Sequence, residues 1–422
     1  MPMRSELPSG MRLVEVTGDR YSEWLDAWLG AFASPPGGDP AVVDFYRRTH
    51  PPERAIAIDD GTGYVATNSS QHRDLVLPGG AAVPLAACTG GSCHPTLRRR
   101  GLMRATLLRL HERAVEEGKP IAAGGVSEWP IYWRFGYGPA TSYNALDIDV
   151  KGVGWRSDAP GGDLEVRRVD GAEARTLAQS IYERQAPGTP GEVVPPSCYW
   201  DRLAHDPADA RLEQMLAIGM GGAPRDHVAV GDRGLVSYRI TSDWAPETTP
   251  QNIVHVIDLL AVDAEAAAAL WRYLLSIDMV ARVQVWYSPV DNPLTWWVAD
   301  ARKLRARRHD GLWLRPLDVP ALLEARGWAA DGALTLRVHD PEGYTGGTFR
   351  LEAEDGKATC RRTTAEPDLE MQVAAVGSIL LGGTAATDLA RGGRISAPDP
   401  RAAQLWDTMA TPERAPYISY FY

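Results

Sequence analysis

Three consecutive arginines followed by a glycine, Arg98–Gly101, stand directly before a helix-forming stretch. Apolar residues at Met103, Leu107, Leu110 and Ala114 have the spacing of one buried helical face. The first N–H groups of a helix have no partner inside it, and the helix dipole adds positive potential there. Arginine side chains beside such a terminus strengthen its attraction for phosphate. Taken alone, this loop is equally compatible with a solvated basic turn.

Two strand-like runs flank the expected helix. Residues 83–93 read as a strand that ends at Cys93, and Ile121–Val126 reads as the next buried strand. Gly118 is placed where it can end the helix between them. The loop therefore connects a strand to a helix N-terminus, as in phosphate-binding sites of α/β proteins.

The loop and a second motif carry a resemblance to a known family. The spacing in Arg98–Met103 resembles the pyrophosphate loop, Arg/Gln-x-x-Gly-x-Gly/Ala, of the GCN5-related N-acetyltransferases (GNATs). Residues 127–138, SEWPIYWRFGYG, resemble the signature of the enhanced intracellular survival (Eis) subfamily. Because the two motifs together are far more specific than either alone, the sequence is identified as an Eis-like acetyltransferase.

The resemblance implies acetyl-CoA as co-substrate and assigns its contacts. Main-chain groups of the strand would receive the pantetheine arm and offer N–H to the thioester oxygen; these belong to Gly91, Ser92 and Cys93. The pyrophosphate would lie on the loop and first helical turn, at Arg99, Arg100, Gly101, Leu102, Met103 and Arg104. Ser127 and Glu128 would flank the pantetheine arm.

The resemblance also implies the catalytic pair. The tyrosine of the signature is Tyr132, the general acid that protonates the departing thiolate; a side chain with a pKa of about 10 suits that role. The general base is the C-terminal carboxylate, here that of Tyr422, six positions after Pro416. An α-carboxyl group with a pKa of about 3.5 is a weak base in water, so this role requires desolvation at the site.

Candidate amine-binding residues come from two places. Residues 21–32 form an aromatic helical face that, by resemblance, walls the substrate cleft, and Asp26 and Trp28 are its candidate contacts. Trp129 and Trp133 flank Tyr132 where family members usually carry small residues. These indoles either line an aromatic substrate pocket or fill space that the co-substrate needs.

Composition bounds the function. The net charge of −10 argues against general binding of nucleic acid. The four cysteines lack metal-ligand spacing, so we expect no metal site. No apolar run approaches the ~18 residues of a membrane span, and residues 1–10 lack the apolar core of a signal peptide. These features favour a cytoplasmic enzyme.

We expect an α/β (α+β) chain of two GNAT lobes and a sterol-carrier-like domain. The expected divisions are residues 1–150, a linker at 151–163, a second lobe at 164–325 and the third domain at 326–422. Strand 143–150 would close the first lobe. The strand-to-helix junction of the second lobe, AVDAEA at 261–266, is acidic and lacks glycine. We therefore interpret that lobe as a degenerate copy that binds no nucleotide.

The predicted activity is acetyl transfer to a primary amine, either polycationic or aromatic, by a homo-oligomer that the resemblance suggests is a hexamer. Two alternatives remain open. The same acid–base pair could condense an aryl-ethylamine such as tryptophan with a carbonyl acid, a Pictet–Spengler-type reaction, without acetyl-CoA. Alternatively, the protein could be a non-catalytic amine-binding regulator.

Overall fold

The computed structural model describes residues 7–33, 40–204, 225–244 and 249–420. The chain divides into two compact units. Unit 1 comprises residues 1–141, 188–194 and 310–422, and unit 2 comprises residues 142–187 and 195–309. No helix among the described residues is long and apolar enough to cross a membrane.

Unit 1 contains a seven-stranded sheet in the order β1-β2-β3-β4-β5-β14-β6. Its strands are β1 (Arg12–Glu15), β2 (Ala55–Asp59), β3 (Tyr64–Val76), β4 (Ala82–Cys93), β5 (Ile121–Gly125), β14 (Leu312–Pro316) and β6 (Gly138–Pro139). Neighbouring strands are antiparallel except β4 and β5, which are parallel and joined through helix α3 (Leu102–Glu116). The expected strand–helix–strand unit is thus confirmed.

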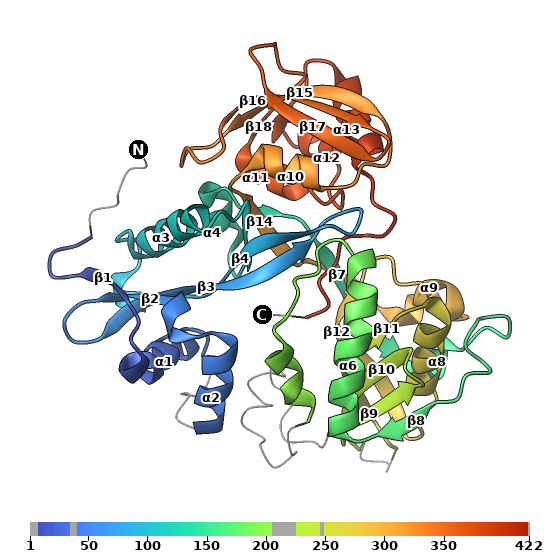
Figure 1. The fold of residues 1–422 in the computed structure, drawn as a ribbon. Coiled ribbons are helices and arrows are strands. Elements are labelled where there is room, and N and C mark those ends of the chain that lie inside the picture. Colours follow the sequence, from blue (N-terminus) through green and yellow to red (C-terminus); the bar gives the residue numbers. More distant parts are fainter. Residues whose placement is uncertain (1–6, 34–39, 205–224, 245–248, 421–422) are drawn as a thin grey trace. The chain divides into compact units, whose positions relative to one another are not determined.

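Helices cover both faces of this sheet. In Figure 1, α3 and the short helix α4 (Trp129–Tyr132) lie on one side of β3 and β4, whereas α1 (Tyr21–Ala31) and α2 (Pro40–Thr49) lie on the other. Gly118, with φ +69°, follows the end of α3 as predicted. The apolar stripe of α3 packs on Ala86 and Cys88 of β4 through Leu107, Leu110 and Ala114.

The third domain belongs to unit 1 and has its own five-stranded sheet, in the order β17-β16-β15-β18-β19. Its strands are β15 (Gly332–His339), β16 (Gly347–Glu354), β17 (Lys357–Arg362), β18 (Leu369–Gln372) and β19 (Ile395–Ser396). Its helices are α10 (Val319–Ala325), α11 (Val373–Ile379), α12 (Ala386–Arg391) and α13 (Pro400–Ala410).

Backbone contacts tie the third domain to the first sheet. A Cβ atom on Gly377 of α11 would lie 2.2 Å from the carbonyl oxygen of Leu314 in β14. A Cβ atom on Gly138 of β6 would lie 1.9 Å from the carbonyl oxygen of Ala374. Only glycine permits this close approach of helix to strand.

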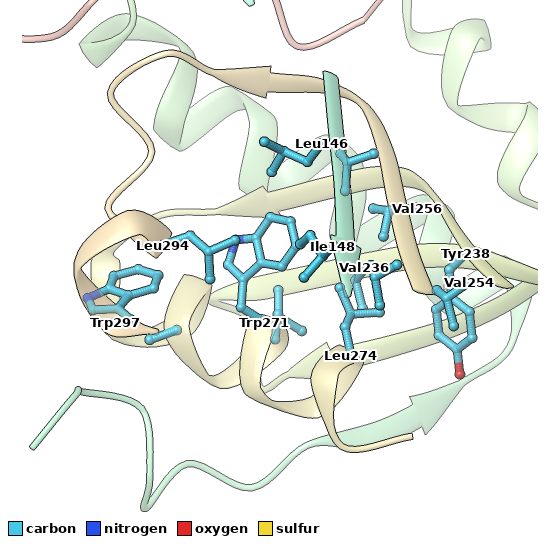
Figure 2. Packing of buried hydrophobic residues seen from close by; sticks show 14 of the residues in the cluster. Leu146, Ile148, Val236, Tyr238, Val254, Val256, Trp271, Leu274, Leu294 and Trp297 are labelled. Atoms are coloured by element: carbon cyan, nitrogen blue, oxygen red, sulfur yellow. The ribbon is translucent and has the colours of Figure 1, made fainter. Parts of the chain in front are cut away.

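Unit 2 repeats the architecture with a sheet in the order β13-β7-β12-β11-β10-β9-β8. Its strands are β7 (Ser142–Asp149), β8 (Arg167–Val169), β9 (Arg225–Val230), β10 (Gly234–Thr241), β11 (Asn252–Ala261), β12 (Val280–Pro289) and β13 (Arg307–Asp310). Its helices are α5 (Val150–Val153), α6 (Gly171–Gln185), α8 (Ala264–Leu275) and α9 (Leu294–Trp297). Figure 2 shows Trp271 and Leu274 of α8 packed against Ile148 and Val236 in its core.

Two expectations about connections are corrected. Strand 143–150 does not close the first sheet; β7 pairs with β12 in unit 2, with Ile148 opposite Val283, and β14 and β6 complete the first sheet instead. Residues 151–163 do not link two domains, because they lie inside unit 2, where α5 ends at Val153 and a Cβ atom on Gly161 would lie 2.5 Å from Ala269 N of α8. Alternation identifies a strand but not its partner, which long-range packing decides.

Candidate active site

Strands β4 and β5 diverge in the middle of the first sheet. Their parallel pairing covers only Leu85–Ala87 and Ile121–Ala123. Beyond this point β4 continues to Cys93 along β3, and β5 continues to Gly125 along β14. The main chains of Cys88–Cys93 and Gly124–Gly125 are therefore not paired with each other, and we call this break in the pairing the opening of the sheet.

A β-bulge shapes β4 at this opening. Thr67 pairs with Ser92 and Ser69 with Thr89, so β4 holds one residue more than β3 between these pairs. Gly90 in the bulge adopts φ +69°, which disfavours other residues. Its carbonyl oxygen accepts a hydrogen bond from the Thr67 hydroxyl (2.7 Å), which fixes the bulge on β3.

The predicted pantetheine-binding residues lie on this bulged segment. The Ser92 hydroxyl contacts the Thr67 hydroxyl at 2.6 Å, so its side chain is engaged by β3 and its main chain remains the candidate contact. Cys93 is half-buried, and burial raises the pKa of its thiol. A Cβ atom on Gly91 would lie 3.0 Å from Met103 Cε. Glycine at position 91 thus allows the first turn of α3 to approach β4.

The predicted phosphate-binding residues surround the N-terminus of α3. Gly101 precedes the helix with φ +83°, and Arg99 also has positive φ (+64°). The earliest bond of the α3 ladder runs from Ala105 N to Gly101 O, so the N–H groups of Leu102, Met103 and Arg104 precede it. Successive N–H groups in such a turn form an anion-binding concavity.

The loop arginines are available to an anion. Arg98, Arg99 and Arg100 are exposed, and within the described residues none of the three forms an ion pair with an acidic side chain. The corresponding terminus in unit 2 differs: Asp263 accepts a hydrogen bond from Ala266 N (2.9 Å) and pairs with Arg233 (2.8 Å). A carboxylate caps the helix end there, and that the second lobe binds no nucleotide stays a prediction.

Tyr132 ends α4, directly after β5. It is half-buried, and its ring stands edge-on to Tyr137 with the centroids 5.8 Å apart. Burial, and to a smaller extent the proximity of Cys88 and Glu128, raises the pKa of Tyr132 to about 12. The phenol therefore stays protonated at neutral pH. Ser127 and Glu128, which precede α4, are exposed.

A buried polar chain that sequence reasoning missed lies behind Tyr132. The Tyr137 hydroxyl lies 3.6 Å from Cys88 Sγ and 2.9 Å from His111 Nε2. His111 Nδ1 lies 2.8 Å from a carboxylate oxygen of Glu342 in the third domain, and Glu342 pairs with Arg315 (3.3 Å). No local pattern marked these residues, because their partners are up to 231 positions apart.

Residues 417–420, close to the chain end, are docked in unit 1. Tyr422 lies outside the described residues, but Tyr417 and Tyr420 are held by the segment 188–194. Tyr417 N–H donates to Pro190 O (2.8 Å), and the Tyr420 hydroxyl donates to Val193 O (2.7 Å). Sequence reasoning identified an apolar, docked terminus but not the segment that receives it.

Trp28 belongs to an aromatic cluster at the bulge. A Cβ atom on Gly90 would lie 3.2 Å from Trp28 Cδ2, so the indole covers the bulge. Tyr46 of α2 and His50, which directly follows this helix, contact the same indole edge-on, with centroids 5.3 and 5.2 Å away. Burial lowers the pKa of His50 to about 3, so its imidazole is neutral. Asp26 is exposed and two positions from both Trp24 and Trp28, on the other side of α1.

Trp129 and Trp133, the two indoles close to Tyr132 in the sequence, each pack against another side chain of unit 1. Trp129 is 53% exposed and stands edge-on to Trp313 at 4.7 Å. The Arg394 guanidinium of the third domain lies over the Trp133 ring at 4.7 Å. Both contacts are with the protein itself, so neither indole requires an aromatic ligand to explain its position.

Comparison with known proteins agrees with this geometry. An acetyltransferase (GNAT) domain model matches residues 12–140, a second matches 194–316, and a sterol carrier protein domain model matches 319–419. N-acetyltransferase Eis of Mycobacterium tuberculosis is 35% identical over 379 residues, 87% of this chain and 89% of the relative. An uncharacterized N-acetyltransferase of Streptomyces griseus is 32% identical over 410 residues, 95% and 97% of the two chains.

Solved structures show the same fold. Eis1 from Mycobacterium abscessus matches with a TM-score of 0.82 at 27% identity, over 98% of this chain and 100% of that one. A GCN5-related N-acetyltransferase from Anabaena variabilis matches with a TM-score of 0.80 at 18% identity, over 98% and 100%. Since two GNAT lobes, a sterol carrier domain and full-length relatives coincide, the chain is an acyltransferase that belongs to the Eis family of N-acetyltransferases.

Proposed function

We propose that this enzyme transfers the acetyl group of acetyl-CoA to a primary amine at the opening between β4 and β5. One observation carries the proposal: the bulged, diverging strands lie between a helix N-terminus with exposed arginines and a half-buried, protonated Tyr132. These are the parts that acyl transfer from a CoA thioester requires: an anion site, main-chain donors and an acid.

Acetyl-CoA would bind through main-chain groups. The N–H groups at the start of α3, with Arg99 and Arg100, would hold the pyrophosphate. The pantetheine arm would extend β4 at Gly91–Cys93 in the manner of an added strand. A main-chain N–H of β4 would donate to the thioester oxygen and stabilise the oxyanion.

The proton transfers follow from the proposed pair. The terminal carboxylate of Tyr422 accepts a proton from the attacking amine nitrogen, which forms the new C–N bond. The C–S bond then breaks, and the Tyr132 hydroxyl donates its proton to the CoA thiolate. The overall products are an N-acetylated amine and CoA.

In the proposed site, Tyr132 and the leaving thiolate would have comparable proton affinities. Burial raises the pKa of the neighbouring Cys88 thiol to about 11, and that of Tyr132 to about 12. A thiolate formed beside Cys88 experiences the same desolvation, so its proton affinity approaches that of the tyrosine. In water a tyrosine is too weak an acid to protonate a thiolate efficiently. In the proposed site the two proton affinities would be close enough for the transfer.

The aromatic cluster of Trp28, Tyr46 and His50 is the proposed amine-facing wall. Aromatic faces attract ammonium groups, and the neutral His50 adds no repulsive charge. This favours a cationic primary amine. The condensation of an aryl-ethylamine with a carbonyl acid loses its main support, because packing against Trp313 and Arg394 engages Trp129 and Trp133. A homo-oligomer remains part of the proposal, by family resemblance alone.

The first test is calorimetric titration with acetyl-CoA. Micromolar binding, followed by release of free thiol with members of a polyamine and aryl-amine panel, is the expected result. Absence of binding at millimolar acetyl-CoA would overturn the proposal and direct attention to condensation reactions.

A substitution at Tyr132 then distinguishes an acetyltransferase from a non-catalytic amine-binding protein. Tyr132→Phe should lower kcat by roughly 10²- to 10⁴-fold, the range for a general acid, and leave acetyl-CoA affinity unchanged. Tyr344→Phe is the matched control, since the Tyr344 hydroxyl is also buried but lies in the third domain and has no proposed role. Equal kcat for both variants would contradict the role of Tyr132.

A further inference from the structure

The segment 188–194 connects the catalytic sheet to the chain end. It is the part of the chain between residues 141 and 310 that belongs to unit 1. Val76 N–H of β3 donates to Glu192 O, and Gly191 N–H donates to Val76 O, both at 2.8 Å. Val194 N–H donates to Asp74 O (2.9 Å). These main-chain bonds fix the segment on the strand that neighbours the bulged β4.

The Glu192 side chain extends this connection to the tail. It is fully buried (0% exposed). One of its carboxylate oxygens accepts hydrogen bonds from Ser419 N–H (3.2 Å) and from the Ser419 hydroxyl (3.1 Å). A carboxylate removed from water depends on hydrogen-bond donors. Among the described residues of the tail, Ser419 is the one that donates two hydrogen bonds to it.

Hydrogen bonds at three neighbouring positions of the segment hold residues 417–420. Tyr417 N–H is bound to Pro190 O, Ser419 to Glu192, and the Tyr420 hydroxyl to Val193 O. A Cβ atom on Gly191 would lie 3.1 Å from Tyr417 O, so the tail and segment are in direct main-chain contact. From Ser419 to Tyr422 the chain can extend at most roughly 10 Å, which confines where its terminal carboxylate can lie.

We infer that Glu192 is a positioning residue for the terminal carboxylate. Its carboxylate binds Ser419, and the main chain of the segment 188–194 binds β3, the neighbour of β4. Glu192 thus links the tail to the sheet that carries the proposed site. The inference rests on the proposed role of the Tyr422 carboxylate as general base. It assigns a catalytic contribution to a residue that neither touches substrate nor belongs to either sequence motif.

The test compares Glu192→Ala with Glu192→Gln in the full-length protein. Glutamine keeps an oxygen that can accept both Ser419 hydrogen bonds, whereas alanine keeps none. We expect Glu192→Ala to lower kcat at least tenfold with unchanged KM for acetyl-CoA, since small displacements of a catalytic group cost up to about 10²-fold. Glu192→Gln should recover most of this loss. Ser419→Ala, which removes one of the two bonds, should fall between them.

Two controls separate positioning from folding. Glu324 of α10 also has a carboxylate that accepts a backbone N–H, here from Cys360 of β17 at 2.8 Å, but it lies in the third domain. Glu324→Gln is therefore the first control. It should leave kcat unchanged. Acetyl-CoA affinity and the thermal midpoint are measured for every variant; if Glu192→Ala unfolds, Ser419→Ala alone decides. Wild-type kcat in Ser419→Ala and Glu192→Ala would overturn the inference.

A chain lacking Tyr422 distinguishes this inference from the proposed function. If the terminal carboxylate is the base, this chain loses activity, and adding Glu192→Ala to it lowers kcat no further. If the truncated chain keeps full activity, the base role fails irrespective of Glu192. If it is inactive but Glu192→Ala and Ser419→Ala have full activity, the base role stands and the positioning role of Glu192 is wrong.

Discussion

Tyr132 and Cys88 show how one environment sets two proton affinities. Both side chains lie behind the opening of the sheet, and burial is the largest cause of the raised pKa at each. Cys88 is thus a neutral thiol that packs against Tyr137, and its high pKa argues against a nucleophilic role. The same desolvation keeps Tyr132 protonated, so in its proposed role it would give up its proton only to a strongly basic leaving group.

The raised pKa of Tyr132 predicts the alkaline behaviour of the enzyme. With a pKa of about 12 in the free enzyme, Tyr132 remains protonated through pH 10, so it should produce no alkaline decline of kcat/KM below that pH. An unperturbed tyrosine would begin to lose its proton near pH 9 to 10. Measurement of kcat/KM from pH 6 to 10.5 checks this, and a decline with a midpoint below pH 10 that vanishes in Tyr132→Phe would contradict it.

At the scale of elements, the bulge in β4 controls what the opening can hold. Gly90 combines positive φ with close contact to Trp28, and Gly91 admits Met103. The strand therefore needs small residues on both sides where it leaves β5. These contacts explain why two consecutive glycines stand at positions 90 and 91.

A pair of glycines with the same φ isolates the effect of the bulge. Gly90 and Gly118 both have φ +69°, but a Cβ atom on Gly118 would meet nothing within 4 Å. Gly118→Ala should cost about 1 kcal/mol of unfolding free energy from backbone strain alone and leave activity intact. Gly90→Ala should cost about 2 to 3 kcal/mol, since Trp28 must also move, and should raise KM for the amine. Urea unfolding and steady-state kinetics measure both; equal losses would exclude a role for Trp28 contact.

The sequence predicted those elements that local patterns specify. Helix α3 and strands β4 and β5 were located within a residue or two, because periodicity, Gly118 and the arginine loop act locally. The partner of β7 was not predictable, since alternation is the same for every sheet. Tyr46, His50, His111 and Glu192 were also missed; each acquires its role only when distant segments pack together.

At the scale of the whole molecule, unit 1 is assembled from three stretches of chain. The third domain is joined to the first sheet through β14, helix α11 and the buried chain that ends at Glu342. It also carries residues 417–420, which bind the segment 188–194. Glu342 is the residue at which the strength of the domain's attachment can be measured, because it pairs with Arg315 of β14.

Glu342→Gln should destabilise unit 1 in a pH-dependent manner. Burial raises the pKa of Glu342, but His111 and Arg315 outweigh it, and the net pKa is lowered from 4.5. A lowered pKa contributes stability that is present above pH 4.5 and is lost as the pH falls through the lowered value. At pH 7 the variant should lose about 2 kcal/mol, less than the usual 3–5 for a broken buried pair, because Asp340 still pairs with Arg315 at 2.7 Å.

The deficit of Glu342→Gln should begin to shrink when unfolding is measured near pH 4, because the wild-type carboxylate then binds a proton in the unfolded chain before it does so in the folded one. Glu366→Gln is the matched control: Glu366 pairs with Arg337 at 3.8 Å but is 95% exposed, so its removal should leave the unfolding free energy unchanged at both pH values. A deficit of equal size at pH 7 and pH 4 would mean that the carboxylate acts through shape alone. In that case charge would play no part in holding the third domain against the catalytic sheet.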